Sequence, residues 1–249
     1  MLRMNPATTE ESVINIRKSE SRGVIDFGWL KSGHTFSFCS SCDPRFSAFS
    51  ALRIINDDRI EVRSGFDTHG HQHMQIISYV KTGALAHKDS MGNVETIPTG
   101  DVQWISAGTG VLHSEFNLTD VETNFFQIWV LPRTDYIELS CEERPVSAMA
   151  TNNYLIPLAS PDGLDDSLSI NQDVLLYKIN PGQLPTRIKL DPHRCKFVQV
   201  VERMCSSTDK YFRQKTWCTL KMNVRSLSVA WEVSFSISIY RDTVLRDLL

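Results

Sequence analysis

The chain has 249 residues and a formal net charge of -3, with 41% hydrophobic and 22% charged residues. This length allows one large β domain or two smaller domains, and the hydrophobic content is enough for a full core. The charge balance offers no basic face for nucleic acid, and no apolar run of about 18 residues predicts a membrane-spanning helix.

The N-terminal stretch MLRMNPATTEESVINIRK lacks the apolar region of a secretory signal, so we expect a cytoplasmic protein with free thiols. Cys39 and Cys42 have C-x-x-C spacing, but the other four cysteines are scattered singly. We therefore interpret the pair as two loop thiols in preference to a redox or metal site.

Residues 1–15 are polar and are expected to be disordered. From Phe36 onward, short β-type runs alternate with turn residues. FSALRIINDDRIEV predicts two strands joined by a turn at Asn56-Asp57-Asp58, and Gly83 predicts a break after MQIISYVKT. Further turns are predicted at Gly92-Asn93, Pro98 to Gly100 and Gly108 to Gly110, and NFFQIWV is a further strand.

A domain boundary is predicted in the polar segment between about Arg133 and Pro161. The second half is also strand-like, and SFSISIYRD alternates at period two, although no glycine occurs from Gln183 to Leu249. Many short strands with Gly and Pro in the turns predict an all-β sandwich or barrel.

Three histidines at alternate positions, His69, His71 and His73, lie in GFDTHGHQHMQI. Residues i and i+2 of a strand point to the same face, so His69 and His71 can reach one metal ion. The same spacing recurs at His113 and Glu115 in VLHSEFN. Histidines within a β core are usually structural, but two such pairs on neighbouring strands would place four ligands together.

Six motifs in order, GWLKSGHTFSF, DPRFSAFSALRIINDD, GFDTHGHQHMQI, HKDSMGN, SAGTGVLHSEFN and FFQIWVLP, resemble the pirin family of the cupin superfamily. The resemblance implies a bicupin, with two β-barrel domains packed face to face. We expect a metal-binding barrel over 16–140 and a second barrel without metal over 141–249. The ligands implied by motif position are His69, His71, His113 and Glu115.

Three imidazoles and one carboxylate suit a first-row divalent ion and do not suit Ca²⁺ or Mg²⁺, which prefer oxygen ligands. The ligand set does not separate Fe(II) from Mn, Co, Ni or Cu, and the resemblance favours Fe(II). It further implies a quercetin 2,3-dioxygenase type of reaction, in which O₂ opens a flavonol and carbon monoxide is released. A small aromatic substrate and O₂ are the expected partners.

Gln75 stands where cupins usually carry glutamate, and glutamine can orient a proton but cannot accept one at neutral pH. His73 would share the face of His69 and His71 if the strand continued without a bulge, and its ordinary pKa suits a general base. His73 and Gln75 are therefore the candidate catalytic residues. For His73 two alternatives stay open: it could form part of the pocket wall, or it could be a metal ligand.

Two other functions stay open. A metal-binding, redox-responsive regulator that docks on another protein is favoured by the loss of the first-motif glutamate at Gln75. A cupin isomerase or epimerase would use the metal and His73 for proton transfer without oxygen.

Overall fold

A computed structural model describes residues 13–38, 40–135, 137–146, 155–179, 186–189, 191, 194–200, 205–207, 210–212, 217–221, 226–229 and 234–240. Within these ranges the regular structure is β, apart from Val146, which is helical, and three short 3-10 turns: η1 Ser19–Ser21, η2 Pro44–Phe46 and η3 Leu164–Asp166. No helix in them has the length and apolar character needed to cross a membrane. The all-β prediction is confirmed.

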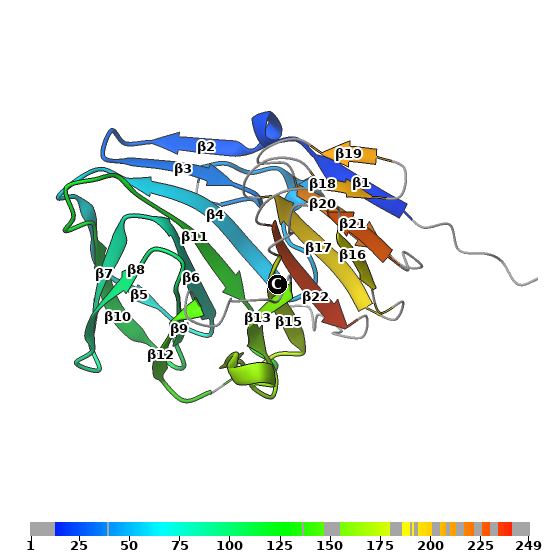
Figure 1. The fold of residues 1–249 in the computed structure, drawn as a ribbon. Coiled ribbons are helices and arrows are strands. Elements are labelled where there is room, and N and C mark those ends of the chain that lie inside the picture. The colour runs from blue at the N-terminus through cyan, green and yellow to red at the C-terminus, as the bar shows by residue number, and fades with distance from the viewer. Residues whose placement is uncertain are drawn as a thin grey trace, which may run out of the picture.

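The first half of the chain forms a seven-stranded and a four-stranded antiparallel sheet (Figure 1). The larger sheet, in the order β12-β9-β6-β11-β4-β3-β2, contains β2 Gly23–Asp26, β3 Leu30–His34, β4 Leu52–Ile60, β6 Gln75–Thr82, β9 Val102–Ser106, β11 Thr123–Val130 and β12 Ser140–Arg144. The smaller sheet, in the order β5-β10-β7-β8, contains β5 Gly65–His71, β7 Ala84–Asp89, β8 Val94–Pro98 and β10 Val111–Phe116.

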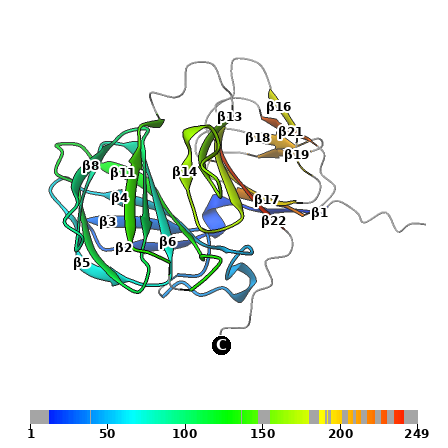
Figure 2. The ribbon, with the colours of Figure 1, turned by 90° about the horizontal axis from the view of Figure 1, so that it is seen from below.

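The second half repeats this arrangement beside the first (Figure 2). Its seven-stranded sheet, in the order β1-β20-β17-β22-β15-β13-β14, contains β1 Val13–Arg17, β13 Leu155–Ser160, β14 Leu168–Ser169, β15 Val174–Ile179, β17 Arg194–Val200, β20 Trp217–Lys221 and β22 Ser234–Tyr240. Its four-stranded sheet, in the order β16-β21-β18-β19, contains β16 Thr186–Lys189, β18 Cys205–Ser207, β19 Lys210–Phe212 and β21 Ser226–Val229.

The N-terminal strand of the chain belongs to a sheet of the second half. β1 pairs with β20 and so belongs to the second half, as Figure 1 shows. The expected limit between a disordered 1–15 and a barrel from residue 16 therefore falls inside a strand, and residues 1–12 lie outside the described ranges. The expected limit at 140/141 also falls inside a strand, because β12 pairs with β9 of the first half.

One large hydrophobic cluster joins the two halves. It includes Phe36, Phe49 and Phe126 from the first half and Leu176 and Phe197 from the second, all less than 9% exposed. The Phe36 and Phe197 ring centroids lie 5.5 Å apart. Fully burying a side chain of this size contributes roughly 1.5–3 kcal/mol to stability. Each of these side chains therefore stabilises the contact between the halves as a core residue would stabilise either sandwich.

The predicted turn at Asn56-Asp57-Asp58 is wrong, since all three residues are buried within the continuous strand β4. Period-two alternation sends Asp57 to one face, where it pairs with Lys81 and lies 3.6 Å from Arg22. Asn124 Nδ2 donates a 3.0 Å hydrogen bond to Asp57 Oδ1. Partners from neighbouring segments therefore override the local turn preference of this tripeptide.

Burial opposes ionisation of Asp57, but Lys81, Asn124 and Arg22 outweigh it, and the pKa of Asp57 falls to about 2. A carboxyl whose pKa is lower in the folded state stabilises the fold above its unfolded pKa. That contribution is lost as the pH falls from about 4 through about 2.

We predict that Lys81→Met destabilises the protein by about 3–5 kcal/mol at pH 7, because it leaves the buried Asp57 carboxylate without its closest cation. The loss should shrink toward pH 4, where the unpaired carboxyl can take up a proton. Urea unfolding at both pH values measures this.

The matched control is Asp120→Asn, which breaks the exposed Arg63–Asp120 pair at 3.0 Å. Exposed pairs contribute at most about 1 kcal/mol, so this variant should unfold close to wild type. Equal losses in the two variants would contradict a buried role for the Asp57 pair.

Candidate metal centre

The register of two short strands brings the predicted histidines together. β10 pairs antiparallel with β5, and His113 lies directly opposite His69. Gly65 permits this close pairing, because a Cβ there would lie 2.2 Å from the Glu115 carbonyl oxygen. His113 and Glu115 are both buried on the same face of β10, as their spacing predicted.

The three histidines form a compact cluster, and their ligand nitrogens all lie within 4.8 Å of one another. The ring centroids of His69 and His113 are 4.4 Å apart, and those of His71 and His113 are 4.8 Å apart. The predicted convergence of the two strands is therefore present in the structure for these three side chains.

Their protonation states suit metal binding. Burial and then the neighbouring His69 lower the pKa of His71 to about 4. Burial, followed by His69, His71 and His87, lowers the pKa of His113 to about 2. At neutral pH both rings are therefore uncharged, which is the form that ligates metals.

The free nitrogens point to a missing partner. His69 Nδ1 lies 2.8 Å from the Asp67 carbonyl oxygen, which can only accept, so Nδ1 carries the proton and Nε2 keeps its lone pair. His71 Nε2 and both nitrogens of His113 are buried, and no hydrogen-bond partner for them lies among the residues that the structure describes. Buried polar atoms are normally satisfied, so these residues fit a divalent metal ion.

Glu115 lies beside the cluster and outside the group of atoms that meet within 4.8 Å. Gln127 Nε2 donates a 2.9 Å hydrogen bond to Glu115 Oε2, and Trp129 Nε1 donates a 3.0 Å bond to Gln127 Oε1. Burial and the nearby Asp58 raise the pKa of Glu115 to about 8. The hydrogen bond from Gln127 holds the carboxyl group in place, and a metal ion bound by Glu115 would displace the proton that the raised pKa favours at neutral pH.

A cavity of about 490 Å³ opens onto this group. It is lined by Ile25, Phe27, Leu30, Ser32, His34, Phe38, Ser40, Asn56, Asp58, Phe66, His69, His71, Glu115, Gln127 and Trp129. Aromatic rings therefore form much of the wall, with a few polar groups among them, as is common in sites for small aromatic ligands.

The two candidate catalytic residues lie elsewhere. β5 ends at His71, and His73 is an exposed residue of the following turn with a φ of 52°, so it does not share the face of His69 and His71. Gln75 is fully buried and its Oε1 accepts a 2.7 Å hydrogen bond from the Asn171 backbone, which ties β6 to the second half. Neither residue lines the cavity.

Asp58, which was predicted to lie in a turn and not in a site, lines the cavity and is 3% exposed. Burial raises the pKa of Asp58 to about 7, with the Ser32 hydroxyl opposing this shift and the Asp57 carboxylate adding to it. The apolar residues on both sides of Asn56-Asp57-Asp58, in LRII and at Ile60, were the signal that one strand continued through it.

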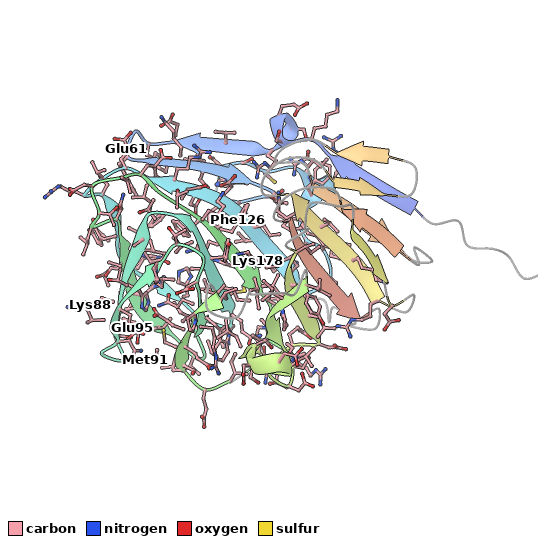
Figure 3. All side chains as sticks on the ribbon, viewed as in Figure 1. Glu61, Lys88, Met91, Glu95, Phe126 and Lys178 are labelled. Carbon is pink, nitrogen blue, oxygen red and sulfur yellow. The ribbon has the colours of Figure 1, made fainter. Side chains whose placement is uncertain are left out.

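Phe126 and Cys42 do not line the cavity. Phe126 packs in the core, where Figure 3 shows it well inside the molecule, and Lys81 Nζ lies 4.1 Å from its ring centroid. Cys42 is exposed and free, whereas Cys39 lies outside the described residues.

Comparison with known proteins agrees with this geometry. The family model described as Pirin matches residues 15–130. Quercetin 2,3-dioxygenase of Escherichia coli (strain K12) is 46% identical over 167 residues, which cover 67% of this chain and 71% of that protein. A pirin-like protein of Caulobacter vibrioides is 40% identical over 177 residues, covering 70% of this chain and 76% of that protein.

Solved structures extend the likeness to nearly the whole chain. YhhW from Escherichia coli has a TM-score of 0.85 at 34% identity and covers 91% of this chain and 97% of its own. The same bacterial pirin, in complex with nickel(II), also has a TM-score of 0.85. A quercetin 2,3-dioxygenase from Acinetobacter baumannii shares the fold, with a TM-score of 0.68 at 19% identity. On this evidence the chain belongs to the pirin family and has the bicupin fold.

Proposed function

We propose that this protein is a cytoplasmic, metal-dependent dioxygenase that opens flavonols such as quercetin with O₂ at a single mononuclear centre. The observation that carries the proposal is the cluster of His69, His71 and His113, of which His69 and His71 line an aromatic-walled cavity. The relative named quercetin 2,3-dioxygenase, at 46% identity, supports the reaction type.

The proposed ligands are His69, His71 and His113, with Glu115 as the fourth. Fe(II) is the proposed ion, and the nickel(II) complex of the related pirin supports a first-row divalent metal. When bound, such an ion would polarise the substrate oxygen and supply the redox chemistry that O₂ requires.

The protein side chains position the substrate and its proton. Phe27, Phe38 and Trp129 offer flat apolar surface for a planar ring system. Asp58, with a pKa of about 7, can accept the proton of a flavonol hydroxyl at Oδ1 and hold it away from water. The Trp129–Gln127–Glu115 hydrogen bonds keep the Glu115 carboxyl in one orientation.

The metal site predicts a loss of binding in single variants. Protein loaded anaerobically with Fe(II) should hold iron at the cluster, and His69→Ala and His113→Ala should each lose about one equivalent by elemental analysis. The matched control is His73→Asn, which removes an exposed imidazole and keeps a residue that tolerates the left-handed backbone. Equal iron in all four proteins would contradict the assignment.

The reaction predicts that iron-loaded protein consumes O₂ when quercetin is added and releases carbon monoxide. His69→Ala should abolish both signals, because it removes a ligand. An oxygen electrode measures the O₂ consumed and a carbon monoxide trap measures the product released in the same turnover. Full iron occupancy without any oxygen uptake would reject the dioxygenase and favour the regulatory alternative.

Asp58 predicts a separable effect on turnover. Asp58→Asn should keep wild-type iron content but lower kcat for quercetin by roughly 10²-fold, as expected for loss of a proton acceptor. Because the raised pKa of Asp58 marks a buried group whose ionisation costs stability above pH 4, this variant should be at least as stable as wild type at pH 8. Unchanged kcat would remove Asp58 from the mechanism.

A further inference from the structure

A second group of metal-ligating side chains lies on the other side of β10 from the cavity residues already described. It consists of His87 and Asp89 from β7 and Cys141 from β12, whose ligand atoms all lie within 4.8 Å of one another. His87 and Asp89 are two residues apart and both buried on the same face of β7. Ligand atoms bound to one ion at about 2.0–2.3 Å lie less than about 4.6 Å apart, so only a small adjustment is needed.

His87 supplies an independent sign of a missing partner. The residue is 1% exposed, and within the described part of the chain neither of its buried ring nitrogens, Nδ1 and Nε2, has a hydrogen-bond partner. Burying an imidazole with neither nitrogen satisfied costs free energy, whereas a metal ion would use one lone pair.

The surrounding charge favours a cation. Asp89, Glu95 and Glu143 act on the Cys141 thiol, and together with its burial, which is the larger cause, they raise the pKa of Cys141 to about 12. Figure 3 shows Glu95 with Lys88 and Met91 at the end of the first sandwich that lies away from the second half. A bound cation would reverse this effect, because it stabilises the thiolate form.

Asp89 is already oriented for binding. Its Oδ1 accepts hydrogen bonds from the backbone of Met91 at 2.9 Å and of Asn93 at 3.1 Å. Its Oδ2 accepts one hydrogen bond, from Asn93 Nδ2 at 2.7 Å. Each carboxylate oxygen has room for about two partners, so Oδ2 keeps a position for a metal.

We propose that His87, Asp89 and Cys141 form a second metal site, separate from the histidine cluster, which takes a borderline ion of the zinc class. One nitrogen, one oxygen and one sulfur ligand are the combination that zinc binds in tetrahedral sites, with water free to complete the set. The His87 and His113 ring centroids are 5.4 Å apart, so the second site lies directly behind a proposed ligand of the first.

Cobalt(II) tests this proposal, because it replaces zinc and gives a near-ultraviolet thiolate-to-cobalt absorption that imidazole and carboxylate ligands cannot produce. Full-length His69→Ala, in which the first site is disabled, should bind about one equivalent of cobalt(II) with this absorption. Adding Cys141→Ser should abolish the absorption, and adding His87→Gln should weaken binding by at least about tenfold.

The matched control is Cys42→Ser in the same background, which removes an exposed free thiol and should leave the absorption intact. Thermal unfolding of each variant establishes that it is folded. Absorption that persists in Cys141→Ser, or its absence at saturating cobalt(II) in the parent, would overturn the proposal. Neither result depends on whether flavonols are turned over.

Discussion

The pairing of β5 with β10 is the constraint on which the metal centre depends. A slip of one residue in an antiparallel pair turns every side chain to the opposite face, and here it would remove His113 from its place opposite His69. The register shifts between His113 and Glu115, so that Glu115 lies opposite Phe66. This irregularity lets His69, His71 and Glu115 line the same cavity although their strands do not match residue for residue.

The alternation of side chains along β4 gives the adjacent residues Asp57 and Asp58 different environments. Asp57 faces Lys81 and Arg22 and is stabilised as an anion, whereas Asp58, one residue on, lines the cavity with a raised pKa. Two adjacent carboxyls therefore reach neutral pH in different states because of what each strand face packs against. The ion pair stabilises the sheet, and within it the Asp57 carboxylate helps to keep a proton on Asp58 while Lys81 opposes this effect.

The local parts of this structure were predictable from sequence. Gly83 and Gly92 adopt positive φ in the turns where they were expected, and the spacing of His69, His71 and His113 identified the cluster. The missed features depend on partners distant in the chain. β1 pairs with a strand about two hundred residues later, and Asn56-Asp57-Asp58 stays extended because Lys81 and Asn124 satisfy Asp57. Cys141 showed no motif in the sequence, because its neighbours His87 and Asp89 lie far from it in the chain and on a strand of the other sheet.

The buried imidazoles connect stability to metal occupancy. His71 Nε2, both ring nitrogens of His113 and, behind them, both ring nitrogens of His87 are buried, and none has a hydrogen-bond partner among the described residues. Each costs free energy in the metal-free fold that a ligand could recover, since an ion that binds the folded chain alone stabilises it by RT ln(1 + [M]/Kd). Because the three rings lie on strands of one four-stranded sheet, bound ions would stabilise the pairing of β5, β10 and β7. In a β sandwich built this way, the unsatisfied nitrogens that destabilise the sheet without an ion are the atoms that a bound ion would satisfy.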